Sequence, residues 1–269
     1  MRNTAPCILY AALKIYAENP DAIMLVAPSD HWIENEKEFI KNIQTSFDAC
    51  AKEDILMTLG IQPENPNTGY GYIQFNKDSS EIKKVKNFTE KPNVDSANKF
   101  LKSGDYLWNA GIFVWSVKSI LKAFKNHLPE MTTILDDGNN VYNSDFEDDF
   151  IRSNYPKCEN ISIDFGIMER AKNVFVLPVN FGWNDLGTWG SLHNKLQKDK
   201  QQNAAVGGQV IFKDANGNMV RTNTGKKVII QGLNDFIVVE KDDTILICPK
   251  KNEQDIKELR TIFNDDFKR

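Results

Sequence analysis

The sequence contains few of the residues from which disulfide-stabilised and zinc-binding proteins are built. Its 269 residues include four cysteines and three histidines. The cysteines stand far apart, with no C-x-x-C pair and no histidine beside any of them: Cys7, Cys50, Cys158 and Cys248. This spacing argues against a disulfide framework and against a zinc site, and it fits a reducing cytoplasm best.

The sequence also lacks an excess of positive charge and any long apolar run. Its formal net charge is −4 and its pI is about 5.5, whereas a general nucleic-acid-binding protein needs a basic face. No apolar stretch approaches the length of a membrane span, and Met1–Pro6 lacks the basic and apolar regions of a signal peptide. These absences predict a cytoplasmic protein that binds neither nucleic acid nor a membrane.

What the sequence does contain is an alternation of apolar runs with amphipathic segments. The run 22–27 predicts a strand buried on both faces of a parallel sheet. Further strands are predicted at 55–61, 70–75, 82–88, 111–115 and 173–179. Helices are predicted from Thr4, as N-cap, to about residue 19, over 36–52 and 95–102, and as three segments between 117 and 171. This alternation predicts an α/β layer sandwich.

The pattern changes after about residue 200. Short β runs separated by turn residues then follow one another, without a strict repeat period, and a helix is predicted from about Glu253 to Phe263. We therefore expect a larger α/β domain over residues 1–195. A β-rich tail over 204–269, with a terminal helix, is a candidate dimerisation element.

Two aspartates stand just after predicted strands. Asp30 follows the run 22–27, and Asp185 follows the run 173–179 with glycines and tryptophans around it. Ligands of open α/β sheets bind outside the carboxyl ends of strands, and carboxylates there can hold Mg²⁺ against nucleotide phosphates. The alternatives are that Asp30 caps the following turn and that Asp185 belongs to a structural loop.

Polar residues in three other places could bind a phosphorylated sugar. Pro92 favours an extended Lys91, whose charge could bind a phosphate, and Glu90 could accept hydrogen bonds from sugar hydroxyls. Gly71 could bring backbone amides to a sugar ring, and Asn109 offers an amide beside a tryptophan. An exposed charged strand end and a simple turn are the alternative readings.

Seven motifs then occur in an order that resembles a known family. They are RNTAP (Arg2–Pro6), VAPSDH (Val26–His31), GYGYI (Gly69–Ile73), FTEKP (Phe88–Pro92), WNAGIFVW (Trp108–Trp115), IDFGIMERA (Ile163–Ala171) and GWNDLGTW (Gly182–Trp189). Together they resemble bacterial mannose-1-phosphate guanylyltransferases, within the sugar-phosphate nucleotidyltransferases, over nearly the whole chain. The resemblance implies a Rossmann-like nucleotidyltransferase layer sandwich with a mixed, mostly parallel sheet.

The resemblance also implies roles for particular residues. Asp30 and Asp185 would hold the catalytic Mg²⁺, and Lys91 would bind the phosphate of the sugar. The mannose would be lined by Gly71, Glu90 and Asn109, and the guanine would lie near Asn3 and Thr4. The substrates would be GTP and mannose 1-phosphate, the products GDP-mannose and pyrophosphate, and a homodimer would be the candidate assembly.

One element of the family has no counterpart in the sequence. The family's first strand and the glycine-rich loop that wraps the triphosphate are missing, so we expect domain 1–195 to be truncated and its activity impaired. Losing one preorganised donor typically costs about 2.7–4 kcal/mol of barrier. A non-catalytic sugar-phosphate-binding subunit, and a nucleotidyltransferase for another sugar 1-phosphate, remain alternatives.

Overall fold

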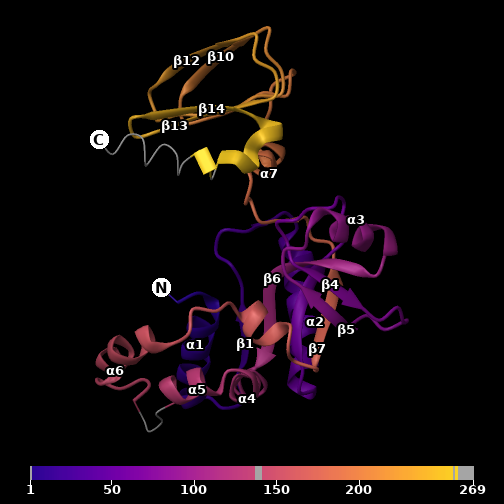
Figure 1. Ribbon diagram of the computed structural model, residues 1–269, viewed down its shortest axis with the longest axis vertical. Helices are drawn as coiled ribbons and strands as arrows, with labels where there is room; N and C mark the ends of the chain where they lie inside the picture. The colour runs from indigo at the N-terminus through magenta and orange to yellow at the C-terminus, as the bar shows by residue number, and fades with distance from the viewer. Residues whose placement is uncertain (1, 137–140, 257, 260–269) are drawn as a thin grey trace. The chain divides into compact units, whose positions relative to one another are not determined.

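The chain divides into two compact units, which are described separately. The computed structural model describes residues 2–136, 141–256 and 258–259 (Figure 1). The first unit is Met1–Trp183 and the second unit is Asn184–Arg269. Among the described residues, no helix is long and apolar enough to cross a membrane.

A six-stranded sheet forms the centre of the first unit. Its strands are hydrogen-bonded in the order β1-β6-β3-β7-β5-β4, and β4 also pairs with β6. The sheet is mixed, as predicted, but it is not mostly parallel: among its described pairings only β3 and β7 are parallel, whereas β5 and β6 run antiparallel to their neighbours. The strands are β1 (Ile23–Val26), β3 (Leu56–Ile61), β4 (Tyr72–Phe75), β5 (Lys83–Thr89), β6 (Tyr106–Ser116) and β7 (Val174–Val179). Two-residue strands also form at β2 (Trp32–Ile33) and β8 (Trp183–Asn184).

The surroundings of β1 differ from the prediction. The strand lies at the edge of the described sheet, antiparallel to β6, and not inside a parallel sheet. Met24 is buried, but Leu25 is 39% exposed. The apolar run correctly predicts a strand, but a run of this kind does not show which strands lie beside it.

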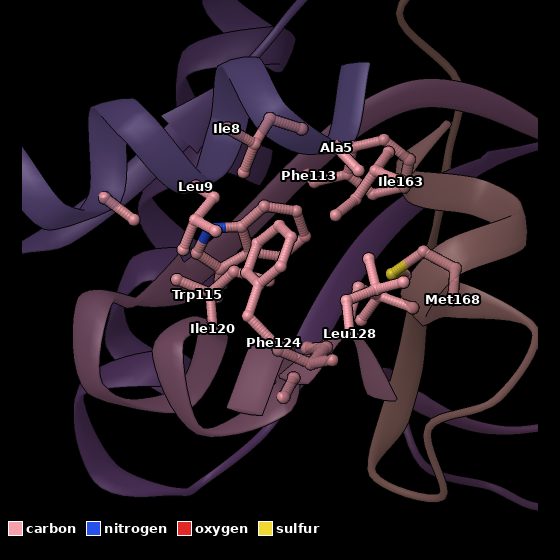
Figure 2. Close-up of a cluster of buried hydrophobic side chains, with 14 of the residues drawn as sticks. Ala5, Ile8, Leu9, Phe113, Trp115, Ile120, Phe124, Leu128, Ile163 and Met168 are labelled. Atoms are coloured by element: carbon pink, nitrogen blue, oxygen red, sulfur yellow. The ribbon is translucent and has the colours of Figure 1, made fainter. Parts of the chain in front are cut away.

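Helices cover both faces of this sheet. On one face lie α1 (Thr4–Glu18), α4 (Val117–His127) and α5 (Pro129–Leu135), which contact one another (Figure 1). Figure 2 shows the core beneath them, where Leu9 of α1 and Phe124 of α4 surround Trp115 of β6. The other face is covered by α2 (Glu36–Lys52), whose Ile43 and Cys50 belong to a second core.

The sequence predicts these helices because their buried residues recur at helical spacing. In α1 the residues Ala5, Ile8, Leu9, Ala12 and Leu13 are all buried. The N-cap of α1 is Asn3, however, and not Thr4, because the Asn3 side chain accepts a hydrogen bond from the Thr4 amide at 2.9 Å. The remaining helices of the unit are α3 (Val94–Ser103), α6 (Glu147–Asn154), a 3₁₀ turn (Tyr155–Lys157) and a π-helix (Asp164–Met168).

The second unit is a stack of β rungs. Strands β9 (Ala204–Val206), β11 (Met219–Arg221) and β13 (Phe236–Lys241) pair in parallel, as do β10 (Gln209–Lys213) and β12 (Lys227–Gln231). The antiparallel strand β14 (Thr244–Pro249) covers the edge of β13. The unit also contains α7 (Trp189–Lys195) and a 3₁₀ helix (Lys250–Asp255). Of the predicted terminal helix, 253–263, residues 257 and 260–263 lie outside the described residues, whereas 253–255 belong to the 3₁₀ helix and 256, 258 and 259 are α-helical.

Buried asparagines connect the rungs. Asn218 is fully buried, and its Nδ2 donates to Asn203 Oδ1 at 3.0 Å and to the Leu233 carbonyl at 2.8 Å. Its Oδ1 accepts from the Phe236 amide at 2.9 Å. The side chain therefore satisfies polar groups on the rungs before and after its own, which favours stacking of successive rungs.

Candidate active site

A charged turn follows directly after β5. Lys91 Nζ lies 2.8 Å from Glu90 Oε1, and this contact raises the pKa of Lys91 above its usual range. The Glu90 side chain is only 11% exposed, whereas that of Lys91 is 64% exposed. The Glu90 carboxylate is thus fixed while the ammonium group faces solvent, where it can reach a charged ligand.

The proline after Lys91 predicts an extended backbone there, but the structure shows a different conformation. Its φ is +44°, in the left-handed region that residues other than glycine seldom adopt. The turn is held by a hydrogen bond of 3.3 Å from the Glu90 amide to Glu169 Oε1, as well as by the Glu90–Lys91 pair. Strain of this kind is concentrated at functional sites, where surrounding contacts maintain it.

Asn109 is oriented by hydrogen bonds on both ends of its amide. Its Oδ1 accepts from Thr58 Oγ1 and from the Gly111 amide, each at 3.1 Å, and its Nδ2 donates to Asp164 Oδ1 at 3.0 Å. The pairing of β3 with β6 shifts register at this point, between Thr58 and Gly60. Irregularities of this kind re-aim side chains next to active sites.

Gly71, which directly precedes β4, lies against these residues. Its carbonyl accepts a hydrogen bond from the Asn109 amide at 2.8 Å. A Cβ at this position would overlap Glu90 Oε2 and lie 3.4 Å from Asn109 Cβ. A larger residue would therefore displace the Glu90 carboxylate, and the structure brings Gly71, Glu90, Lys91 and Asn109 together.

Asp164 belongs to the same cluster, although the sequence analysis did not single it out. It begins the π-helix, an element that often marks functional sites. Burial and the negative charge of Glu90 raise the pKa of Asp164 from 3.8 to about 6, against smaller opposing contributions that include its hydrogen bond from Asn109. An aspartate inside the apolar segment Ile161–Met168 was the available signal, since a buried carboxylate needs a reason to be there.

Thr4, which follows the N-cap Asn3, connects to this cluster through the chain before Asp164. Thr4 Oγ1 accepts a hydrogen bond from the Ile163 amide at 2.9 Å, and the Ala5 amide donates to the Ile161 carbonyl at 3.2 Å. The start of α1 therefore fixes the segment that leads into the π-helix.

Aromatic side chains from several segments contact one another beside His31, in the loop that follows β1. Trp183 Nε1 donates to His31 Nδ1 at 3.0 Å, and the two rings meet edge to face at 5.4 Å. The Tyr70 ring lies 5.4 Å from that of Trp183 and 5.0 Å from that of Trp108. Trp108 and Asn109 are neighbours on β6, where successive side chains point to opposite faces of the sheet.

The two predicted metal ligands lie in different units. Asp30 is exposed in the turn after β1. Asp185 belongs to the second unit, where its Oδ1 accepts a hydrogen bond of 3.0 Å from the Gly187 amide. Within the described residues, no three His, Cys, Asp or Glu side chains are grouped as a metal site. Mg²⁺ is commonly held by one or two carboxylates together with substrate phosphates, so the residue types fit this ion.

The sequence of the first unit and the start of the second identifies the family. The family described as nucleotidyl transferase matches residues 1–202. The chain belongs to the nucleotidyl transferase family. A second match, over residues 208–260, is to the β-helix domain described as mannose-phosphate isomerase/GMP-like, in agreement with the stacked rungs of the second unit.

Other members of the family are similar to the chain over nearly its whole length. It is 32% identical to an Escherichia coli protein named mannose-1-phosphate guanylyltransferase, over 96% of this chain and 57% of that protein. It is 33% identical to the alginate biosynthesis protein AlgA of Pseudomonas aeruginosa, over 96% of this chain and 54% of that protein. The chain thus spans about half the length of these curated relatives.

A solved structure has the same fold. The protein from Thermus thermophilus, named a mannose-1-phosphate geranyltransferase, superposes with a TM-score of 0.85 at 26% identity. The match covers 98% of this chain and 76% of that one. It confirms the predicted α/β sandwich followed by a β-rich unit.

Proposed function

We propose that the chain acts as a mannose-1-phosphate guanylyltransferase, which converts GTP and mannose 1-phosphate into GDP-mannose and pyrophosphate. The observation that carries this proposal is the cluster of Glu90, Lys91, Asn109 and Asp164 against Gly71. The name of the relative from Escherichia coli supports the same choice of sugar and base.

The cluster offers complementary groups to the two ends of a sugar phosphate. Lys91 supplies a positive charge at the surface for the phosphate. The carboxylates of Glu90 and Asp164 are acceptors for sugar hydroxyls, and Asn109 has one amide hydrogen besides the one given to Asp164. Because Asp164 and Glu90 are shielded from water, hydrogen bonds to their oxygens discriminate strongly between hydroxyl patterns.

In the proposed reaction the protein positions the two substrates and neutralises their charge. A phosphate oxygen of mannose 1-phosphate attacks the α-phosphorus of GTP, a new P–O bond forms, and the bond to the departing pyrophosphate breaks. Lys91 would hold the attacking phosphate next to the α-phosphorus of GTP. Its positive charge would reduce the repulsion between the two anionic substrates.

We further propose Asp30 and Asp185 as Mg²⁺ ligands. When bound, the ion would neutralise charge on the nucleotide phosphates. Both residues are carboxylates that follow strands. Asp30→Asn and Asp185→Asn should each raise the Mg²⁺ concentration needed for half-maximal pyrophosphate release. An unchanged requirement in both variants would exclude these ligands.

We also propose that guanine lies near Asn3 and Thr4. This proposal is supported by the two hydrogen bonds that connect the start of α1 to the segment before Asp164. Thr4→Val should then weaken GTP binding more than binding of mannose 1-phosphate. Equal weakening of both ligands would indicate a loss of structure instead.

The sugar-phosphate pocket can be tested by calorimetric titration of the 269-residue chain with mannose 1-phosphate. Lys91→Met should weaken binding about 10–100-fold, because it removes a charge-assisted hydrogen bond. Lys86→Met, at an exposed position on β5, is the matched control and should bind as the wild type does. Equal affinity of Lys91→Met and wild type would refute the assignment.

Turnover is tested separately by adding GTP and Mg²⁺ and measuring pyrophosphate release. Release that depends on mannose 1-phosphate and falls in Lys91→Met supports the enzyme. Binding without release favours a non-catalytic sugar-phosphate-binding subunit.

The second unit carries apolar side chains that suit self-association, and we propose a homodimer through them. Ile211 and Ile229 are direct partners across β10 and β12 and are 63% and 73% exposed. Ile245 and Ile247, on one face of β14, are 66% and 58% exposed. The two pairs lie on different sheets of the second unit, and exposed apolar residues of this kind often mark protein interfaces. Ile229→Lys should shift sedimentation from dimer to monomer, and a dimer that persists would refute this surface.

We propose the cytoplasm as the location of this reaction. All four cysteines are free thiols, and three of them are buried: Cys50, Cys158 and Cys248. Free thiols persist in a reducing compartment. Cell fractionation that recovers the chain outside the cytoplasm would contradict the proposal.

A further inference from the structure

A cavity of about 470 Å³ opens in the second unit, and none of the residues that line it is assigned to the proposed reaction. Its walls come from the same corner of three successive rungs, at the ends of β9, β11 and β13. Val206, Arg221 and Val239 are register partners across these strands and all line the cavity. Trp189, at the start of α7, adds an aromatic wall. Its volume is within the range of small-molecule sites.

The floor of this cavity is backbone that cannot be rearranged easily. Gly207 has φ +92°, and a Cβ there would run into the Thr222 carbonyl oxygen. The Thr222 amide donates to the Val206 carbonyl at 3.0 Å, and the Thr222 side chain is buried. The two rungs therefore meet closely at this corner, and their contact holds the cavity open in a fixed shape.

A carboxylate is fixed in the wall in the same way. Glu240 Oε1 lies 3.1 Å from Lys226 Nζ, and Glu240 Oε2 accepts a hydrogen bond of 3.3 Å from the Asn223 amide. The Glu240 side chain is only 13% exposed. Each of its oxygens retains a lone pair, so the group can accept further hydrogen bonds from a ligand.

The wall also contains donors whose side chains remain available. Among the described residues, the side chains of Arg221 and Lys241 have no hydrogen-bond or ion-pair partner, and Asn223 uses only its backbone groups. The acidic residues of the wall are Glu240, which is paired with Lys226, and Asp242. The cavity thus presents charged groups of both signs together with neutral polar groups.

We propose that this cavity binds a neutral hexopyranose. The C–H face of a pyranose packs on an aromatic ring such as that of Trp189. Its ring hydroxyls would be hydrogen-bonded by Glu240 as acceptor and by Arg221 and Asn223 as donors. The residues belong to the second unit alone and include none of those assigned to the sugar-phosphate pocket, so the site does not depend on the proposed reaction.

The experiment uses the full chain labelled with 5-fluorotryptophan, which gives one fluorine resonance for each of the five tryptophans. Trp189→Phe identifies the Trp189 resonance. Titration with methyl α-mannopyranoside, which carries no phosphate, should shift this resonance with a dissociation constant in the millimolar range. Methyl α-glucopyranoside and GDP-mannose, titrated in parallel, show whether one hexose or a nucleotide-linked hexose is preferred.

Two variants connect the shift to the cavity. Arg221→Ala and Asn223→Ala should each weaken the interaction, by about tenfold for the charged donor. Lys227→Ala, at an exposed position on β12 outside the cavity, should have no effect. The proposal is overturned if the Trp189 resonance does not move up to about 50 mM glycoside, a concentration that would detect even a millimolar site. It is also overturned if inorganic phosphate alone shifts this resonance, or if both variants bind as tightly as the wild type.

Discussion

Replacing Asp164 by asparagine should make the protein more stable at neutral pH. Burial beside Glu90 raises the pKa of Asp164 from 3.8 to about 6. Between these values the folded protein keeps a proton that the unfolded chain has released. Stability therefore falls as the pH rises through this window, and the full penalty is present above pH 6.

The size of the effect follows from the shift. About two pKa units at about 1.4 kcal/mol each give a penalty of about 3 kcal/mol. Asparagine cannot ionise, and its Oδ1 can still accept the hydrogen bond from Asn109 Nδ2. Asp164→Asn should therefore gain about 2–3 kcal/mol at pH 8, and about 1 kcal/mol at pH 4.5 where the wild type is mostly protonated. For a unit of this size the gain at pH 8 corresponds to about 5–10 °C in Tm.

Urea unfolding at the two pH values measures this difference. Asp149→Asn is the control, because the Asp149 side chain is 88% exposed, and it should change neither curve. A gain in Asp164→Asn that is equal at both pH values would show that ionisation is not the cause. A loss of stability at pH 8 would refute the reasoning. The same variant should bind mannose 1-phosphate more weakly, because an acceptor oxygen becomes a donor.

Three further predictions concern other parts of the fold. Glu147 accepts hydrogen bonds from Lys14, at 2.6 Å, and from Tyr10, and these lower its pKa to about 2. Glu147→Gln should therefore lower the free energy of unfolding by about 1–2 kcal/mol at pH 7. In acid-unfolding curves this difference from the wild type should disappear as the pH falls from 4.5 to 2. Gly71→Ala should weaken mannose 1-phosphate binding about tenfold in calorimetry with little change in Tm, because the new Cβ displaces a pocket carboxylate but not the core. A large fall in Tm would contradict this. Asn218→Ala should lower the free energy of unfolding by about 2–4 kcal/mol, because it leaves buried hydrogen-bonding partners unsatisfied. It should also increase hydrogen exchange in the second unit, and unchanged exchange there would contradict the role of the asparagine stack.

The sequence predicted the helices and strands best where the spacing of apolar residues is regular. The helix predicted over 36–52 coincides with α2, and the strand predicted over 55–61 is β3. The position of β1 in the sheet was predicted less well, because an apolar run does not reveal its neighbours. The rungs of the second unit have no strict period, since a buried asparagine stack tolerates turns of different length.

The candidate site was predicted in part. The order of seven motifs led to Gly71, Glu90, Lys91 and Asn109, which the fold brings together. Asp164 was missed, because the burial that raises its pKa comes from strands and turns distant in the chain.

The sequence by itself therefore determined the family, the classes of secondary structure and most of the residues that the fold brings together in the candidate site. These depend on local spacing and on motifs, which are properties of neighbours along the chain. Only the tertiary structure decided the left-handed backbone of Lys91, the π-helix that presents Asp164, and the corner cavity of the second unit. Each of these arises where segments distant in sequence meet, because burial, charge and close backbone approach are set by whatever residues lie across the contact.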